Sequence, residues 1–74
     1  MSRRKNEALF APFGVSARER AIAEWLPSAQ DRRIMTRALV IHDTYAAIAE
    51  AEGMTEKQIA RRIHRAEDIL YKHM

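Results

Sequence analysis

Apolar side chains recur along this chain at intervals of three and four residues, the spacing of helices that cover a core. Polar residues that can cap a helix separate the apolar stretches, and together they predict helices over 16–26, 28–41 and 45–52. A fourth helix is predicted from Thr55 nearly to the C-terminus. The pattern therefore predicts an all-α protein of about four helices.

The first two predicted helices have recognisable ends. Ser16 and Glu19 have the spacing of a capping box, which indicates a start at Ser16, and Pro27 ends that helix. Ser28 is the expected cap of the second helix, which closes at 42–44. The residues expected to face the core are Ile22, Trp25 and Leu26 in the first helix and Ile34, Met35, Ala38, Leu39 and Ile41 in the second.

The third and fourth helices have the layout of a helix-turn-helix over 45–66. Ala49 is small where two helices would cross, Gly53 can adopt the left-handed conformation of a turn, and Ile59 anchors the second helix in the core. The alternative is an ordinary helical hairpin. Local signals of helix starts are the Thr44 cap, the Thr55–Gln58 capping box and the Met54–Ile59 staple. The inner stripe of the last helix is Ile59, Ile63, Ala66 and Leu70.

Residues 1–14 differ from the rest, because Pro12 and Gly14 interrupt any helix there. We expect this segment to be a mobile arm preceding a helical domain over 15–74. Its basic tip and apolar cluster suggest a contact surface for a partner, since exposed aromatic clusters often mark interaction sites. The alternative is that Phe10 and Phe13 cover the core. The candidate contact residues are Arg3, Arg4, Lys5, Leu9, Phe10 and Phe13.

Composition restricts the class of protein. Seventy-four residues suffice for one small domain, and the absence of cysteine excludes disulfides and thiolate metal sites. The longest run of large apolar residues, 39–41, is far shorter than the roughly 20 residues that span a bilayer. The basic N-terminus lacks the apolar stretch of a secretory signal. We therefore expect a soluble protein of the cytoplasm without membrane contact.

The net charge of +3 favours a nucleic-acid partner, but its distribution weakens that interpretation. Residues 1–43 carry the whole excess of positive charge, whereas residues 44–74 hold five basic and five acidic side chains. Lys57, Arg61 and Arg65 could follow a phosphate backbone along one face of the last helix. The alternative for them is a solvated face.

Catalytic and metal-binding patterns are weak. His42, His64 and His73 lack the spacing of metal ligands, and we expect His64 and His73 to be solvated. Ser16 and Ser28 are better explained as caps than as nucleophiles. We expect neither a cofactor nor an enzymatic activity. No heptad stretch demands dimerisation, so a monomer is expected.

A longer composite pattern covers residues 26–70. It consists of Leu26-Pro27, Arg32 and Arg33, Thr44-Tyr45, Ile48-Ala49, Gly53-Met54-Thr55, Ile59, Arg61-Arg62, Ile63-His64-Arg65-Ala66 and Leu70. These residues closely resemble region 4 of bacterial sigma factors, most strongly that of the small alternative sigmas. Two departures concern DNA reading: Ala47 stands where the family often has glutamate, and Glu67 and Asp68 stand where it has basic residues. Carboxylates near phosphates would oppose binding.

The resemblance implies a free-standing region 4-like regulator of transcription, because 74 residues leave no room for the other sigma regions. In sigma factors, region 4 has two partners, promoter DNA and the flap of RNA polymerase. The chain is thus similar to small bacteriophage proteins that bind host RNA polymerase, inhibit sigma-dependent initiation or promote antitermination. Polymerase binding is the favoured interpretation, with promoter DNA or nascent RNA as a further partner.

The alternative is a sequence-specific DNA-binding regulator that reads the major groove with the start of the last helix. The residues that would contact DNA are Glu56, Lys57, Gln58, Ala60, Arg61 and Arg62, with Arg65 one turn further.

Overall fold

The computed structural model describes residues 10 and 12–73, and its regular elements within these ranges are helices. They are α2 (Val15–Trp25), α3 (Ala29–Thr36) with its continuation η2 (Arg37–Ile41), α4 (Tyr45–Glu52) and α5 (Glu56–His73). The prediction of an all-α fold is confirmed. The predicted helix boundaries agree with these to within two residues.

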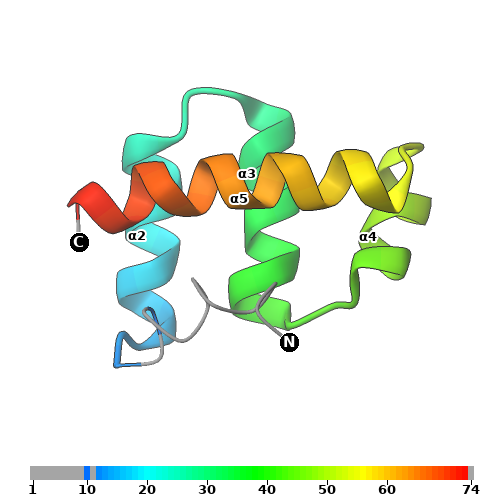
Figure 1. The fold of residues 1–74 in the computed structure, drawn as a ribbon. Coiled ribbons are helices and arrows are strands. Elements are labelled where there is room, and N and C mark those ends of the chain that lie inside the picture. Colours follow the sequence, from blue (N-terminus) through cyan, green and yellow to red (C-terminus); the bar gives the residue numbers. More distant parts are fainter. Residues whose placement is uncertain (1–9, 11, 74) are drawn as a thin grey trace.

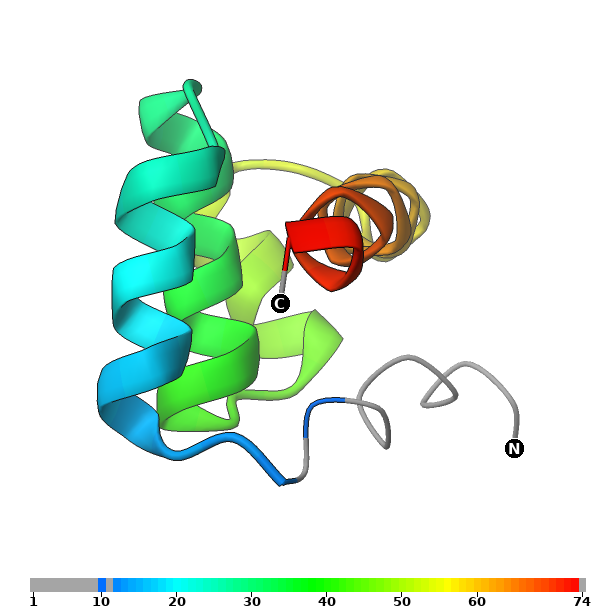
Figure 2. The same cartoon turned by 90° about the vertical axis from the view of Figure 1, so that its left-hand side faces the viewer.

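The helices surround one core. α2 and the rod made of α3 and η2 stand side by side, and α5 lies across both, with α4 beside its first half (Figures 1 and 2). Every helix therefore presents one face to the centre. The side chains with no exposed surface include Phe10, Ile34, Met35, Ile48, Ile59 and Leu70.

Local capping explains where three of the helices begin. The Ser28 hydroxyl accepts a hydrogen bond from the Asp31 N–H at 3.2 Å, as Thr44 does for α4. Thr55 and Gln58 form the reciprocal pair of a capping box, with distances of 3.1 and 3.0 Å. These predicted starts are confirmed, because each cap satisfies an amide that the helix itself leaves free.

The start of α2 differs from the prediction. The helix begins at Val15 with Gly14 as its cap residue, and no side chain caps it. The predicted capping box of Ser16 and Glu19 is therefore wrong, because Ser16 already lies inside the first turn.

The rod of α3 and η2 ends in a wider, π-helical turn. Ala38 and Leu39 remain buried, but Ile41 is 58% exposed. The expectation that Ile41 faces the core is wrong, since a π-helical turn holds more residues than an α-helical one and shifts the side chains that follow it. His42 then terminates the rod in the left-handed conformation, with φ of 67°.

Arg18 joins α2 to the segment before it and to the end of η2 by hydrogen bonds. Its side chain is buried, and its guanidinium donates hydrogen bonds to the carbonyl oxygens of Phe13 (3.0 Å), Leu39 (2.8 Å) and Phe10 (2.6 Å). The Leu39 carbonyl belongs to the last turn of η2, where carbonyl groups lack helical partners and carry partial negative charge. A buried cation is thus stabilised by carbonyl dipoles at the end of a helix.

The contact of Phe10 and Phe13 with the helical core contradicts the prediction for the arm. Phe10 is fully buried within the core, and Phe13 is partly buried against it. The expectation that Phe10 is an exposed contact residue is wrong, because its side chain completes the core beside the backbone groups held by Arg18. Arg3, Arg4, Lys5 and Leu9 lie outside the described residues.

Candidate nucleic-acid interface

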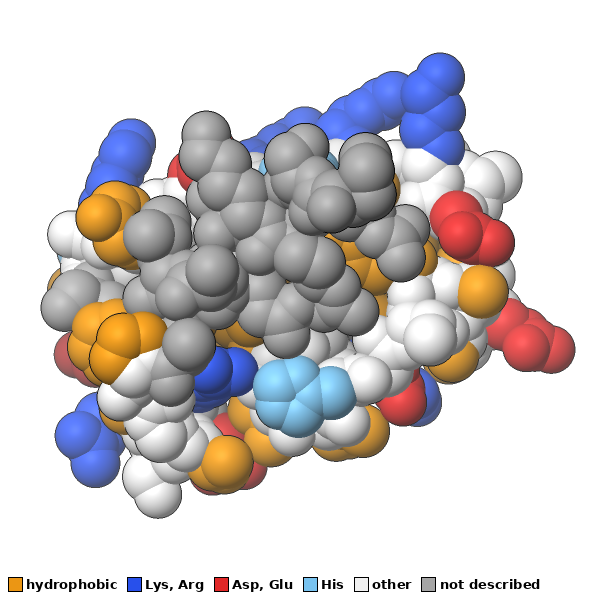
Figure 3. Space-filling model, turned by 60° about the horizontal axis from the view of Figure 1, so that its bottom comes forward, with side chains coloured by type: hydrophobic (Ala, Val, Ile, Leu, Met, Phe, Trp, Pro, Cys, Tyr) orange, Lys and Arg blue, Asp and Glu red, His pale blue; other side chains and the backbone are white. Residues whose placement is uncertain are grey.

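The outer face of α5 follows from its inner stripe. Ile59, Ile63, Ala66 and Leu70 are buried, so residues on the opposite side of the helix point to solvent. Lys57, Arg61 and Arg65 are exposed at intervals of four residues, as the sequence predicted. Figure 3 shows Lys and Arg side chains in a row along the upper edge of the molecule, over α5.

Of the three carboxylates of α5, Glu67 is buried, and Glu56 and Asp68 stand at the two ends of this row. Glu67 is only 3% exposed, and its Oε1 atom lies 3.7 Å from Nδ1 of His64. Of the two acidic residues that depart from the sigma pattern, buried Glu67 is therefore not placed to oppose a phosphate, whereas Asp68 is exposed one turn beyond Arg65. Between Glu56 and Asp68, the exposed face of α5 carries cations without a carboxylate. Residues 44–74 therefore present a basic surface on α5, although their formal charges sum to zero.

A hollow of about 270 Å³ lies beside this row and is called here the α5 hollow. Its lining residues are Met54, Gln58, Arg61, Arg62 and Arg65. Arg61 and Arg65 form no ion pair within the part of the chain that the structure describes. The hollow therefore presents guanidinium groups that could donate hydrogen bonds to the oxygens of a phosphate.

Two of the predicted DNA-contacting side chains also have partners inside the protein. The Gln58 side-chain oxygen accepts a hydrogen bond from the Thr55 N–H, so it is already used by the cap of α5. Arg62 lies on the side of α5 that faces α3, where its Nη1 atom is 2.7 Å from Oδ1 of Asp31. Sequence analysis did not predict this ion pair, because 31 positions separate the two residues.

A second hollow, of about 380 Å³, surrounds the exposed Ile41 and is called here the Ile41 hollow; Arg33, Thr36, Arg37 and Asp43 complete its lining. Nη1 of Arg37 lies 3.1 Å from Oδ2 of Asp43. Arg33 pairs with Glu52 of α4 at 3.0 Å. The hydrogen bond from Arg33 lowers the pKa of Glu52 and raises the pKa of Arg33. The Ile41 hollow therefore combines an apolar side chain with a rim of paired charges.

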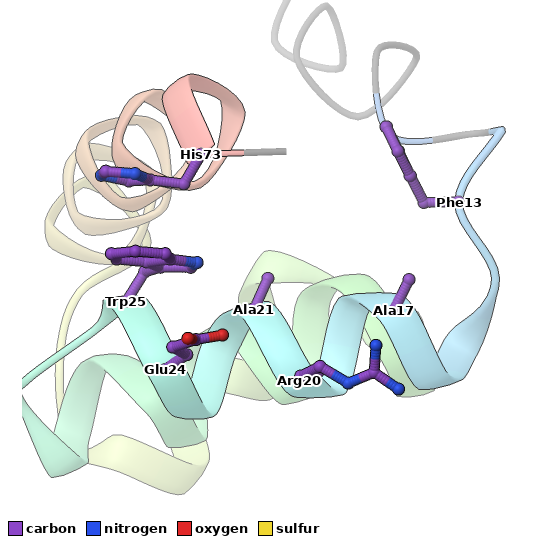
Figure 4. A pocket seen from close by; sticks show the side chains of 7 residues that line it. All are labelled: Phe13, Ala17, Arg20, Ala21, Glu24, Trp25 and His73. Atoms are coloured by element: carbon purple, nitrogen blue, oxygen red, sulfur yellow. The ribbon is translucent and has the colours of Figure 1, made fainter.

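The third hollow lies between α2 and the end of α5, and its volume is about 220 Å³ (Figure 4). Trp25 is 39% exposed and stacks on His73, with ring centroids 3.9 Å apart and an interplanar angle of 5°. The expectation that Trp25 belongs to the core is wrong, because its indole lies outside the buried cluster at the end of α2, where it stacks on His73 of α5. His73 is exposed as expected, yet it is engaged in this stack.

Among the residues that the structure describes, no group of three histidine or acidic side chains is placed to hold a metal ion. No described helix combines the length and apolar composition needed to cross a membrane. No protein-family model, curated protein or solved structure matches this chain.

Proposed function

We propose that this chain is a regulator of transcription that binds duplex DNA through α5. The observation that carries the proposal is the exposed row of Lys57, Arg61 and Arg65, which no carboxylate of α5 interrupts between Glu56 and Asp68. Phosphate contacts from such cations supply most of the affinity of a protein for DNA. The resemblance of residues 26–70 to sigma region 4 supports the same proposal.

The arrangement of α4 and α5 supports a helix-turn-helix. Gly53 has a φ of 68°, and the Met54 N–H donates to the Ala49 carbonyl at 3.0 Å, so the chain reverses within a few residues. The first half of α5 then projects from the turn with its polar face outward. In helix-turn-helix proteins, this part of the second helix enters the major groove.

Titration of duplex DNA at several salt concentrations tests the proposal. We expect binding near 50 mM salt that weakens steeply as salt is added. Replacing both Arg61 and Arg65 with glutamine removes two phosphate contacts and should lower the slope of log affinity against log salt by about 2. The matched control replaces Arg20 of α2 and Arg37 of η2 with glutamine; both lie outside α5, and their loss should change the slope little. Equal losses in both variants, or no binding by the unmodified chain, would contradict the proposal.

Binding to bacterial RNA polymerase is a second candidate. The observation that favours it is the Ile41 hollow, because an exposed apolar side chain surrounded by charged groups resembles the centre and rim of a protein interface. The buried Phe10 no longer supports an apolar contact from the arm. Copurification with purified polymerase, comparing the unmodified chain with Ile41→Ser, tests this candidate. We expect the substitution to weaken capture without lowering the melting temperature.

A further inference from the structure

The ion pair of Arg62 and Asp31 joins the candidate DNA-binding helix to the helix behind it. Both side chains are partly open to solvent, with 34% of Arg62 and 25% of Asp31 exposed. Arg62 also lines the α5 hollow together with Arg61 and Arg65. Of these three arginines, Arg62 alone is paired with a carboxylate among the described residues.

The cap of α3 does not require the Asp31 carboxylate. Ser28 caps the helix by accepting a hydrogen bond from the backbone N–H of Asp31, which leaves the side chain free for another role. A carboxylate in the first turn of a helix gains some stabilisation from the helix dipole, but an amide of the same shape leaves the cap intact. The hydrogen-bonded partner of this carboxylate is the guanidinium of Arg62.

We propose that Asp31 competes with the DNA phosphate for Arg62 and thereby limits the affinity of the α5 surface for nucleic acid. Carboxylate and phosphate oxygens are alternative partners for the same guanidinium N–H donors. Because the pair is partly exposed, Arg62 can exchange one partner for the other without unfolding the helices. This inference rests on the proposed function, in which α5 faces DNA.

The competition predicts a gain of affinity when the carboxylate is neutralised. In Asp31→Asn, Arg62 becomes available to one additional phosphate, so affinity for duplex DNA near 100 mM salt should rise about fivefold to tenfold. The slope of log affinity against log salt should steepen by about 1.

Asp43→Asn is the matched control. It changes the net charge by the same amount and also removes the carboxylate partner of a surface arginine, Arg37, but it lies at the Ile41 hollow. We expect it to leave the affinity within about twofold of the unmodified chain, since added charge far from the contact is screened by salt. Adding Arg62→Gln to Asp31→Asn should abolish the gain.

Each outcome distinguishes the inference from the proposed function. Equal gains in Asp31→Asn and Asp43→Asn would reduce the effect to net charge and overturn the inference, while DNA binding itself would stand. Weaker binding by Asp31→Asn would mean that Asp31 positions Arg62 for contact, which also overturns it. If neither protein binds DNA, calorimetry with tripolyphosphate decides: tighter binding by Asp31→Asn supports the competition although the proposed function fails, and unchanged binding overturns both.

Discussion

The N-terminal and C-terminal halves of this fold are stabilised in different ways. In α4 and α5, the caps and the turn use hydrogen bonds between residues within five positions of each other. In the N-terminal half, Arg18 reaches the Leu39 carbonyl across 21 positions and also holds Phe10. The contrast teaches that short-range patterns predicted the second half well and missed the contacts that organise the first.

The two residues in the left-handed conformation differ in the steric cost of that conformation. Gly53 ends α4 and adopts a φ of 68° without steric cost, because glycine has no Cβ. His42 ends η2 with nearly the same φ of 67°, although a side chain disfavours that region. The Asp43 N–H donates to the Arg37 carbonyl at 2.8 Å, which helps to hold this end closed.

Removing the Phe10 side chain gives the strongest test of how the N-terminal half is held. Phe10→Ala deletes a fully buried ring and should lower the free energy of unfolding by about 3 to 5 kcal/mol, measured by urea denaturation. Phe10→Leu, which fills more of the space, should cost less. Unchanged stability in Phe10→Ala would restore the hypothesis that the segment before α2 is an independent arm.

Arg18 is the next test, because its role depends on contacts that are distant in sequence. Arg18→Met keeps much of the apolar stem but leaves the carbonyls of Phe10 and Leu39 without their donor, so we expect a loss of about 2 to 4 kcal/mol in the same assay. Arg20→Met, on the exposed side of α2, should lie within about 0.5 kcal/mol of the unmodified chain. Similar losses in both variants would remove the distinction between the halves.

Substitution of the left-handed residues sharpens the comparison of the two helix ends. Space is open around the position of a Cβ at Gly53, so the cost of Gly53→Val is backbone strain, about 1 to 2 kcal/mol. Gly53→Asn should cost less, because asparagine tolerates this conformation. His42→Gly relieves backbone strain but also removes a residue that has an interaction partner, so it should change the stability by less than about 1 kcal/mol. Thermal melting of the three variants tests these magnitudes, and a loss in His42→Gly as large as that in Gly53→Val would contradict the comparison.

The smallest expected effect concerns Glu52, which links α4 to α3. Arg33 lowers the pKa of Glu52 in the folded chain, so the pair stabilises above the unfolded pKa of about 4.3 and its contribution disappears as pH falls through the folded pKa. Glu52→Gln should therefore be slightly less stable than the unmodified chain at pH 7 and equal to it near pH 2. The effect is small because Arg33 is largely exposed to solvent. A difference that grows on acidification would contradict this assignment.

The sequence by itself determined the helices, three of their caps, the Gly53 turn and the exposed row on α5. Caps and turns join residues that are close along the chain, and a period of 3.6 residues sets which side chains share a face. Lys57, Arg61 and Arg65 could therefore be assigned to one surface before the fold was known.

Only the tertiary structure decided which charged and aromatic side chains are buried or paired. Arg18 with Leu39, Asp31 with Arg62 and Trp25 with His73 join residues far apart in sequence, and composition contains no signal for such pairs. The burial of Glu67 and the exposure of Ile41 likewise depend on how α5 crosses the other helices and on the wide turn of η2. The physical reason is that a helical period assigns a face, whereas the packing of neighbouring helices decides what that face meets.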